Sequence, residues 1–414
     1  MDLFIESISH NGEGVARNEG KVVFIPYAIP GEVVKVNIIE EKKKYSRGIL
    51  RNIIRKSPHR VDVKCPHFYQ CGGCSYQHIS YQQQLVLKQN IIKEILHRIG
   101  GINPKIMNVM GMPYPWHYRN KVLWHSCECT DGKKIGFYRY QSRQLIEVDD
   151  CALLLPGLNA TSLLVKEILH EVQLEENSSV MIRQSNENKE IIIEFINCSP
   201  DKGALRKLSQ EVEAIYENQH GKIRLLSGRK LIQEKAGKCL FYLGPDDFFQ
   251  VNPEQTEYLI GTVYQYLNLS GYHKVLDAYC GIGMFSLNIA GSTALVIGID
   301  SNIEAVKHAK RNSALNGIIN CQFIAGSCEK IIPAIKEPFD RIIVNPPRAG
   351  LKKEIIRDIT NISPNLMVYV SCNPATLARD LKQFLGNGYR IVNVQPIDMF
   401  PQTSHIENII LLQR

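Results

Sequence analysis

The sequence predicts a multidomain chain with three units of different fold class. From residue 246 to residue 414, apolar strand-like runs alternate with helical patterns, which is typical of an α/β unit with a parallel sheet and right-handed crossovers. Residues 1–57 contain four or five short strand-like runs separated by turns, the pattern of a small β-barrel. Residues 58–245 mix strands and helices without such regularity and are assigned to a central α+β unit.

The N-terminal unit carries a local excess of positive charge. Its strand-like runs LFIESIS, KVVFIPYAI, EVVKVNIIEE and SRGILRNII are separated by turns such as NGEG, and Ser57-Pro58 ends the series. Residues 41–60 hold eight Lys or Arg against one acidic residue, although the formal net charge of the whole chain is only +8. A basic stripe suits a polyanion partner, because binding releases the counterions of the polyanion. A solvated basic face is the alternative interpretation.

Composition excludes several other classes of protein. The 414 residues are 44% hydrophobic and 22% charged, as in globular proteins, and no apolar stretch is long enough to predict a membrane span. The start MDLFIESISHNGEG does not have the pattern of a secretory signal, so we expect a cytoplasmic protein without a membrane partner. A monomer is expected as well. The twelve cysteines are then expected to be thiols, metal ligands or a nucleophile rather than a disulfide framework.

A cysteine cluster opens the central unit. Three thiols follow the spacing C-x5-C-x2-C, and a fourth comes much later, before the run LLLPG. These candidate ligands are Cys65, Cys71, Cys74 and Cys151. By spacing alone, four thiolates suit a zinc ion and an iron–sulfur cluster equally well, and His67 or His78 could join a zinc site. Unconnected thiols are the alternative.

The C-terminal unit can be predicted element by element. A helix begins after Pro253, and the strands that follow are KVLDAY, ALVIGID, CQFIAG, RIIVNPP and LMVYVSC. Helices are predicted at FSLNIA, at IEAVKHAKRNSALNG, after Gly350 and at ATLARDLKQFLG. The last two strands, YRIVNVQPIDMF and HIENIILLQR, have no helix between them, so we expect an antiparallel final strand on an otherwise parallel sheet.

A glycine-containing loop follows the strand KVLDAY. In Cys280–Gly283, the bare backbone of Gly281 can approach a ligand at a helix N-terminus, and Asp300, nineteen residues later, can bind ribose hydroxyls. Ser286 stands where a dinucleotide fingerprint has its third glycine, which weakens a nicotinamide interpretation. The loop therefore favours an adenosine-containing cofactor, with a ligand-free turn as the alternative. Asn345 ends the fourth strand before two prolines, at the edge where such sheets bind ligands.

A cysteine and a glutamate are candidates for covalent chemistry. Cys372 ends the next strand, before a helix whose N-terminal dipole favours a thiolate. Carbon 5 of a uracil becomes a nucleophile when a thiolate adds at carbon 6, and a general base must later remove the carbon 5 proton. Glu407, thirty-five residues after Cys372, is placed for that role at the start of the last strand. A buried structural cysteine and a surface carboxylate are the alternatives.

These motifs together resemble the bacterial RNA (uracil-5-)-methyltransferase family, and in particular its iron–sulfur branch that acts on 23S ribosomal RNA. The resemblance covers essentially the whole chain. It rests on GEGVAR with FIPYAIPGE, CPHFYQCGGCSYQH, FFQVNPEQ, DAYCGIGMF, VNPPRAG, SCNPATLARD and MFPQTSHIE, in this order. Many members of the family have Asp where this chain has Asn345, and some have a polar residue in place of Met284.

The resemblance implies a fold, an activity and a set of site residues. It implies an N-terminal RNA-binding TRAM barrel, a central 4Fe-4S domain and a Rossmann-like S-adenosylmethionine methyltransferase domain. It implies that Gln250, Tyr279, Gly281, Asp300 and Asn345 lie at the cofactor or the target base. It also makes Cys372 the nucleophile, Glu407 the base, and the four cysteines the ligands of the cluster.

Several other functions stay open at this point. The same reaction on transfer RNA is the main alternative for the substrate. Exocyclic amino methylation of adenine also uses NPP-type motifs but needs no thiol nucleophile. A non-catalytic RNA-binding iron–sulfur protein would not need Cys372 or Glu407, and a nicotinamide oxidoreductase would leave both the cysteine motif and the basic stripe unexplained.

Overall fold

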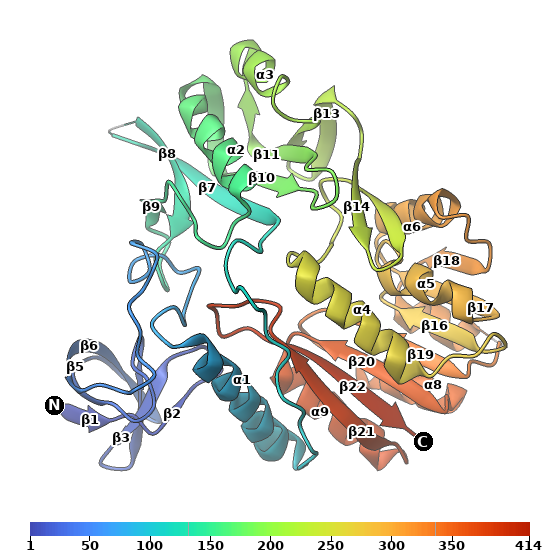
Figure 1. Ribbon diagram of the computed structural model, residues 1–414, viewed down its shortest axis with the longest axis horizontal. Coiled ribbons are helices and arrows are strands. Elements are labelled where there is room, and N and C mark those ends of the chain that lie inside the picture. Colours follow the sequence, from blue (N-terminus) through green and yellow to red (C-terminus); the bar gives the residue numbers. More distant parts are fainter. Residues whose placement is uncertain (131, 336) are drawn as a thin grey trace.

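The computed structural model describes residues 1–130, 132–335 and 337–414. Its strands form a six-stranded sheet, two seven-stranded sheets and a two-stranded hairpin. Figure 1 shows the N-terminal sheet in blue, the central sheet in teal to green and the C-terminal sheet in yellow-orange to red, in three different parts of the molecule. Among the described residues, no helix is both long and apolar enough to cross a membrane.

The N-terminal sheet is built from short strands whose side chains alternate between buried and exposed. The strands are β1 (Asp2–Phe4), β2 (Ser7–Ile8), β3 (Gly14–Asn18), β4 (Lys21–Ile25), β5 (Val33–Glu41) and β6 (Tyr45–Arg55), in the order β1-β5-β6-β4-β3-β2. Apolar residues at every second position, among them Val23, Ile25, Val34 and Val36, form its core. The strand count exceeds the prediction because the run LFIESIS forms two short strands, β1 and β2.

The central sheet has the order β13-β12-β11-β10-β7-β8-β9 and is antiparallel except for the pair β11 and β12. Its strands are β7 (Lys121–Cys129), β8 (Gly132–Tyr138), β9 (Leu145–Glu147), β10 (Val172–Gln184), β11 (Ile191–Pro200), β12 (Ala214–Gln219) and β13 (Lys222–Gly228). Its helices are α2 (Pro156–Glu167), the short turn η2 (Leu169–Glu171) and α3 (Lys202–Leu208). They pack on a core that includes Trp124 and Phe195, so strands and helices share one core in this part of the chain.

The C-terminal sheet has the order β18-β17-β16-β19-β20-β22-β21. Its strands are β16 (Lys274–Ala278), β17 (Leu295–Asp300), β18 (Cys321–Ala325), β19 (Arg341–Val344), β20 (Leu366–Ser371), β21 (Arg390–Ile397) and β22 (Glu407–Gln413). The first five are parallel, and β22 is antiparallel to β20 and β21, as predicted. The strand order turns at β16, which creates a crevice at the carboxyl edge between β16 and β19.

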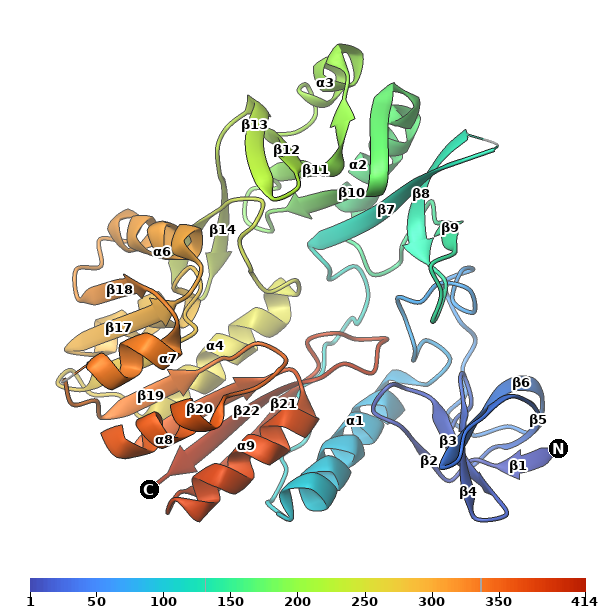
Figure 2. The same ribbon diagram turned by 180° about the vertical axis from the view of Figure 1, so that it is seen from behind.

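Helices cover both faces of this sheet (Figures 1 and 2). They are α4 (Pro253–Leu267), α5 (Met284–Ile289), η3 (Ala290–Ser292), α6 (Ile303–Leu315), α7 (Cys328–Ile331), η4 (Ile332–Ala334), α8 (Lys353–Ile362) and α9 (Pro374–Gly386). Successive strand residues face opposite sides, so Val275 joins the core under α4, α5 and α6, whereas Leu276 joins the core under α8 and α9.

Two segments of residues 58–245 pack on the C-terminal core. Helix α1 (Tyr81–Ile95) and its continuation η1 (Leu96–Gly100) lie against α9, and Ile92 and Leu96 belong to the same core as Leu276. Both views show α1 beside this end of the sheet (Figures 1 and 2). The hairpin of β14 (Ile232–Ala236) and β15 (Cys239–Leu243) packs on α4 and α6. The central region is thus joined to the C-terminal sheet on two sides.

Candidate active site

The carboxyl ends of the parallel strands surround a cavity of about 650 Å³. Every residue that the sequence placed at the cofactor, the target base or the chemistry lines it: Gln250, Tyr279, Gly281, Asp300, Asn345, Cys372 and Glu407. These residues come from six segments of the chain, and the sheet topology brings them together at the crevice predicted for a doubly wound sheet.

The glycine loop between β16 and α5 has the backbone of a ligand cradle. Gly281 and Gly283 have φ values of 54° and 87°, a region that favours glycine, and Tyr279 before them also has a positive φ of 66°. The Oδ2 atom of Asp300 accepts a hydrogen bond from the Gly281 amide at 2.8 Å. This bond ties the loop to the end of β17, so Asp300 both shapes the cradle and faces the cavity.

Ser286, which replaces a fingerprint glycine, has a structural role. Its hydroxyl and its backbone amide donate hydrogen bonds of 2.6 and 3.1 Å to Oδ2 of Asp277, a fully buried carboxyl group. Burial raises the pKa of Asp277 to about 7, while the two bonds to Ser286 lower it. The serine therefore gives a buried acid a partner at the start of α5, which a glycine could do only through its amide.

Cys372 and Glu407 lie at the facing ends of two neighbouring strands. In the antiparallel pair of β20 and β22, Ser371 is opposite Asn408. Cys372, the residue that follows β20, therefore comes opposite Glu407, the first residue of β22. The Nδ2 atom of Asn408 donates to the Ser371 carbonyl at 3.2 Å and holds this end of the pair together. Asn373 caps α9 by accepting a hydrogen bond from Ala375 at 3.1 Å, which places Cys372 just before the positive end of that helix.

Burial dominates the electrostatics of both groups. Glu407 is 4% exposed, and this burial raises its pKa to about 8, against an opposing effect of Arg348. Burial also raises the pKa of the half-buried Cys372 thiol, and the Glu407 carboxylate raises it further. The positive charge of Arg348 lowers the pKa of that thiol. A buried carboxyl group with a pKa of about 8 thus stands beside a thiol that a cation helps to ionise.

Three cavity residues were missed as site residues by the sequence analysis. Arg348 was noted only as part of VNPPRAG, although its charge acts on both Cys372 and Glu407. Phe248 lines the cavity and is 71% exposed, an unusual exposure for a large apolar ring. His405 also lines the cavity, two residues before Glu407. A signal was available for each, because all three lie inside the motifs named above, but their side-chain directions could not be known.

The four candidate ligand cysteines converge on a second, small cavity of about 60 Å³. Residues 65–74 and residue 151 meet there because Cys71 forms an isolated bridge with Arg139, beside the hairpin that leads to Cys151. Burial raises the pKa of all four thiols, and that of Cys71 reaches about 11. His67 lines this cavity too, whereas His78 is buried among aromatic rings, with neither ring nitrogen hydrogen-bonded to a described residue.

The described part of the chain contains no group of three or more His, Cys, Asp or Glu side chains placed to hold a metal ion. The four thiols do line one cavity, but the structure does not show the central iron–sulfur domain that the resemblance implies.

The basic stripe is only partly available to a ligand. Arg60 forms a buried ion pair with Glu32 at 2.6 Å, and Arg47 pairs with the buried Glu13 at 2.6 Å, so both stabilise the N-terminal unit. The side chains that remain exposed are Lys42, Lys43, Lys44, Arg51, Arg55 and Lys56. The three lysines at 42–44 come from the β5–β6 turn, Arg51 and Arg55 from β6, and Lys56 follows that strand.

Fold and site together define a Rossmann-like methyltransferase with an appended N-terminal β unit. Residues 80–414 match the family described as tRNA (Uracil-5-)-methyltransferase, and residues 1–50 match the TRAM domain. The chain therefore belongs to the tRNA (uracil-5-)-methyltransferase family and is an enzyme of the S-adenosylmethionine-dependent RNA methyltransferase class.

Relatives along the whole chain agree with this assignment. An uncharacterized RNA methyltransferase of Halalkalibacterium halodurans is 38% identical over 100% of this chain and 96% of the relative. Another from Caldanaerobacter subterraneus subsp. tengcongensis is 39% identical over 100% of this chain and 98% of the relative. Among solved structures, the Pyrococcus abyssi tRNA (uracil-54, C5)-methyltransferase in complex with S-adenosyl-L-homocysteine matches with a TM-score of 0.80 and 27% identity, covering 100% and 99% of the two chains.

Proposed function

We propose that this enzyme methylates carbon 5 of a specific uridine in RNA through a covalent adduct, with Cys372 as nucleophile and Glu407 as general base. The observation that carries the proposal is the placement of these two side chains at facing strand ends in one cavity with the glycine loop. A thiol and a buried carboxyl group are the two groups that carbon 5 methylation requires.

The thiolate of Cys372 would act first. Its Sγ atom bonds to carbon 6 of the uracil, and the electron pair of the carbon 5–carbon 6 double bond moves toward carbon 5 and the carbonyl oxygen. S-adenosylmethionine supplies the methyl group that carbon 5 then takes up. Arg348, which lowers the pKa of this thiol, would favour the thiolate that starts the sequence.

Glu407 would complete the reaction. Its carboxylate takes the proton that remains on carbon 5, the electrons of that C–H bond restore the double bond, and the carbon–sulfur bond breaks to return the thiolate. With a pKa of about 8, the ionised carboxylate that accepts this proton is the minor form at neutral pH, and its share rises as the pH approaches 8. The burial that raises the pKa also excludes water from the adduct.

The methyl donor would lie along the glycine loop. Asp300, which ends β17, would bind its ribose hydroxyls, and the amide-rich loop at Gly281 would pass close to its amino-acid end. Gln250, Tyr279 and Asn345 line the same cavity and would contact the donor or the target base. The S-adenosyl-L-homocysteine bound to the Pyrococcus abyssi relative supports this cofactor.

Cys65, Cys71, Cys74 and Cys151 would hold a 4Fe-4S cluster. The donor set fits such a group chemically, because four thiols face one cavity and each of Cys71 and Cys74 lies within electrostatic reach of other thiols of the set. The cluster would fix the fold of residues 65–74 or contact RNA, since the methylation itself transfers no electron. Iron–sulfur ligation also supports 23S ribosomal RNA as the substrate, through the resemblance to that branch.

Transfer RNA is the second candidate substrate. It is supported by the Pyrococcus abyssi tRNA (uracil-54, C5)-methyltransferase, whose fold matches this chain over its whole length. In either case the exposed basic residues of the β5–β6 turn would contact the phosphate backbone and position the RNA without specifying its sequence.

The experiment is nucleoside analysis of ribosomal and transfer RNA after incubation with the enzyme and labelled S-adenosylmethionine. The proposal predicts label in 5-methyluridine, and mass spectrometry of RNase-digested ribosomal RNA then locates the modified position. Label in N6-methyladenosine would instead support exocyclic amino methylation. Label confined to transfer RNA would keep the reaction and replace the proposed substrate.

A further inference from the structure

The segment between β21 and β22, residues 398–406, delivers Glu407 to the cavity. It contains no helix or strand, and it also carries Phe400 and His405 into the cavity lining. Glu407 itself is the first residue of β22, where it pairs with Ile397 of β21. A base at the junction of a loop and a strand needs the loop to have one fixed conformation, because the reach of a proton transfer is a single hydrogen-bond length. The contacts that fix this loop come from outside the catalytic sheet.

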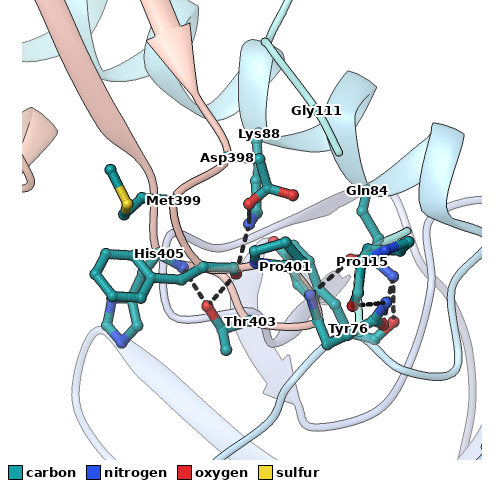
Figure 3. Close-up of polar contacts among 12 residues, drawn as sticks. Tyr76, Gln84, Lys88, Gly111, Pro115, Asp398, Met399, Pro401, Thr403 and His405 are labelled. Atoms are coloured by element: carbon teal, nitrogen blue, oxygen red, sulfur yellow. Dashed lines mark hydrogen bonds and ion pairs between the residues drawn. The ribbon is translucent and has the colours of Figure 1, made fainter. Parts of the chain in front are cut away.

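The first contact is a fully buried ion pair. The Nζ atom of Lys88, on α1, lies 2.5 Å from Oδ1 of Asp398, and both side chains are 0% exposed (Figure 3). Lys88 also donates to the carbonyl of Phe400 at 3.1 Å, and the Tyr81 hydroxyl donates to Oδ2 of Asp398 at 2.9 Å. A buried ion pair whose other donors and acceptors are also hydrogen-bonded fixes the positions of the two side chains more than it stabilises the fold.

The second contact is a reciprocal pair of amides. The backbone N–H of Gln402 donates to Oε1 of Gln84 at 3.1 Å, and Nε2 of Gln84 donates to the side-chain Oε1 of Gln402 at 2.9 Å. Nε2 of Gln84 also donates to the carbonyls of Tyr76 and Ile79, so this buried side chain bridges the loop and the segment before α1 (Figure 3). Gln84 is 1% exposed and Gln402 is 2% exposed.

The backbone of Gln402 is strained, and its surroundings hold it in that state. Its φ of 68° lies in the left-handed region, which is unfavourable for a residue with a side chain. Its carbonyl accepts hydrogen bonds from the amides of Ser75 and Tyr76 at 3.1 and 3.0 Å. Such a conformation persists only where the surrounding residues hold it in place. Two of these residues here, Ser75 and Tyr76, directly follow Cys74.

We propose that Gln402, Gln84 and Lys88 are positioning residues that aim Glu407 at carbon 5, and that the segment after Cys74 sets the geometry of the base from outside the catalytic sheet. The inference rests on the proposed function, in which Glu407 removes the carbon 5 proton. It goes further by assigning control of that step to α1 and to residues 75–76.

The effect is confined to one step because Cys372 is held separately. Cys372 lies between β20 and α9, where the Asn408–Ser371 bond and the Asn373 cap fix its position without the loop. Loosening the loop should therefore leave addition of the thiolate and methyl transfer nearly unchanged. It should slow the step in which Glu407 takes the carbon 5 proton, the double bond re-forms and the carbon–sulfur bond breaks.

The test follows a single turnover on a uridine-containing RNA with labelled S-adenosylmethionine in two variants of the full chain, Gln402→Gly and Gln84→Leu. Glycine accepts the left-handed backbone, so Gln402→Gly removes the side-chain contacts without adding strain. We expect methyl transfer within about twofold of the unmodified enzyme, release of product slower by about tenfold to a hundredfold, and a labelled protein–RNA adduct on a denaturing gel.

Two controls separate the possible failures. Gln395→Ala removes a glutamine that also reaches across from β21, to the carbonyl of Asn108, but outside the cavity, and it should leave both rates unchanged. Glu407→Gln should trap the labelled adduct if the proposed function is right, and its failure to do so would overturn that function.

An adduct trapped by Glu407→Gln but by neither loop variant would overturn the inference alone. Equal slowing of methyl transfer and release would also overturn it, because a merely structural role predicts no selectivity between steps. Affinity for S-adenosylhomocysteine and the melting temperature check the fold, and if Gln84→Leu fails to fold, the result for Gln402→Gly decides.

Discussion

Glu407 begins β22 beside the end of β20, so its carboxyl group faces the same cavity as the Cys372 thiol while the rest of its surroundings exclude water. The Glu407 carboxylate raises the pKa of the Cys372 thiol. Arg348 acts on both in the opposite direction. The site therefore contains one thiol, one carboxyl group and one cation, and the cation opposes the effect of burial on the other two.

Replacing Glu407 with Gln should stabilise the enzyme at neutral pH. Burial raises the pKa of Glu407 from 4.5 to about 8, so the folded state binds a proton that the unfolded state releases between these values. The stabilising contribution is complete below about pH 4.5 and is lost as the pH rises through about 8. The free energy of unfolding of Glu407→Gln should thus exceed that of the unmodified enzyme by up to about 3 kcal/mol near pH 7.

Thermal unfolding of both proteins at pH 5 and at pH 7.5 measures this difference, and the pH 5 comparison is the internal control. The gap in melting temperature should widen with pH. A melting-temperature gap of the same size at both pH values would mean that the pKa of Glu407 is not raised in the folded protein.

Replacing Lys88 with Met should destabilise the enzyme strongly. The substitution leaves Asp398 buried without its cation, and loss of one partner of a buried ion pair costs about 3–5 kcal/mol. Lys88→Met combined with Asp398→Leu removes both charges and should recover most of that stability. Denaturant unfolding of the two variants gives the comparison, and a single variant within about 1 kcal/mol of the unmodified enzyme would contradict it.

Enzyme purified without oxygen should be brown and should contain about four irons per chain, as expected for four thiolate ligands of a cubane cluster. Cys74→Ser should lose the iron and lower the melting temperature, because the segment after Cys74 also holds Gln402. Cys129→Ser, which changes an exposed cysteine outside this cavity, is the matched control and should keep both. Zinc in place of iron in the anaerobic preparation would refute the cluster.

RNA binding should depend on the exposed basic residues of the N-terminal unit. Changing Lys43, Lys44 and Arg51 to Gln together should weaken binding and lower the slope of log affinity against log salt by about 0.7–0.9 for each phosphate that the protein no longer neutralises. Changing Lys202, Arg206 and Lys222, exposed on the central unit, to Gln removes the same charge elsewhere. If both triple variants have the same slope, the stripe is only a solvated face.

Most of the active site could be predicted because its residues end strands. In a parallel sheet the carboxyl ends meet at one edge, so Asp300, Asn345 and Cys372 come together once the strand pattern is recognised. Glu407 was predictable only with the antiparallel final strand, which reverses direction and brings its first residue to that same edge. The four cysteines were predicted as a set, although Cys151 lies far from the others in sequence.

The loop contacts could not be predicted in the same way. Lys88 and Asp398 are 310 residues apart, and a lysine in an amphipathic helix is ordinarily a solvated charge. The pattern of α1 predicts a buried face but not what packs against it. In the structure this face contacts α9 and the loop of residues 398–406. Likewise, nothing in MFPQTSHIE marks Gln402 for a left-handed backbone, since glycine is the residue that normally signals it.

The order of bond making at the target uracil decides whether Cys372 and Glu407 have the proposed roles. Cys372→Ala and Glu407→Gln are each incubated with RNA and labelled S-adenosylmethionine, and the products are separated on a denaturing gel. The account predicts no methylation and no adduct from Cys372→Ala, and a stalled, methylated protein–RNA adduct from Glu407→Gln, like the adduct that the unmodified enzyme should form with 5-fluorouridine RNA. An adduct formed equally well by Cys372→Ala, or free methylated product released by Glu407→Gln at the normal rate, would contradict it.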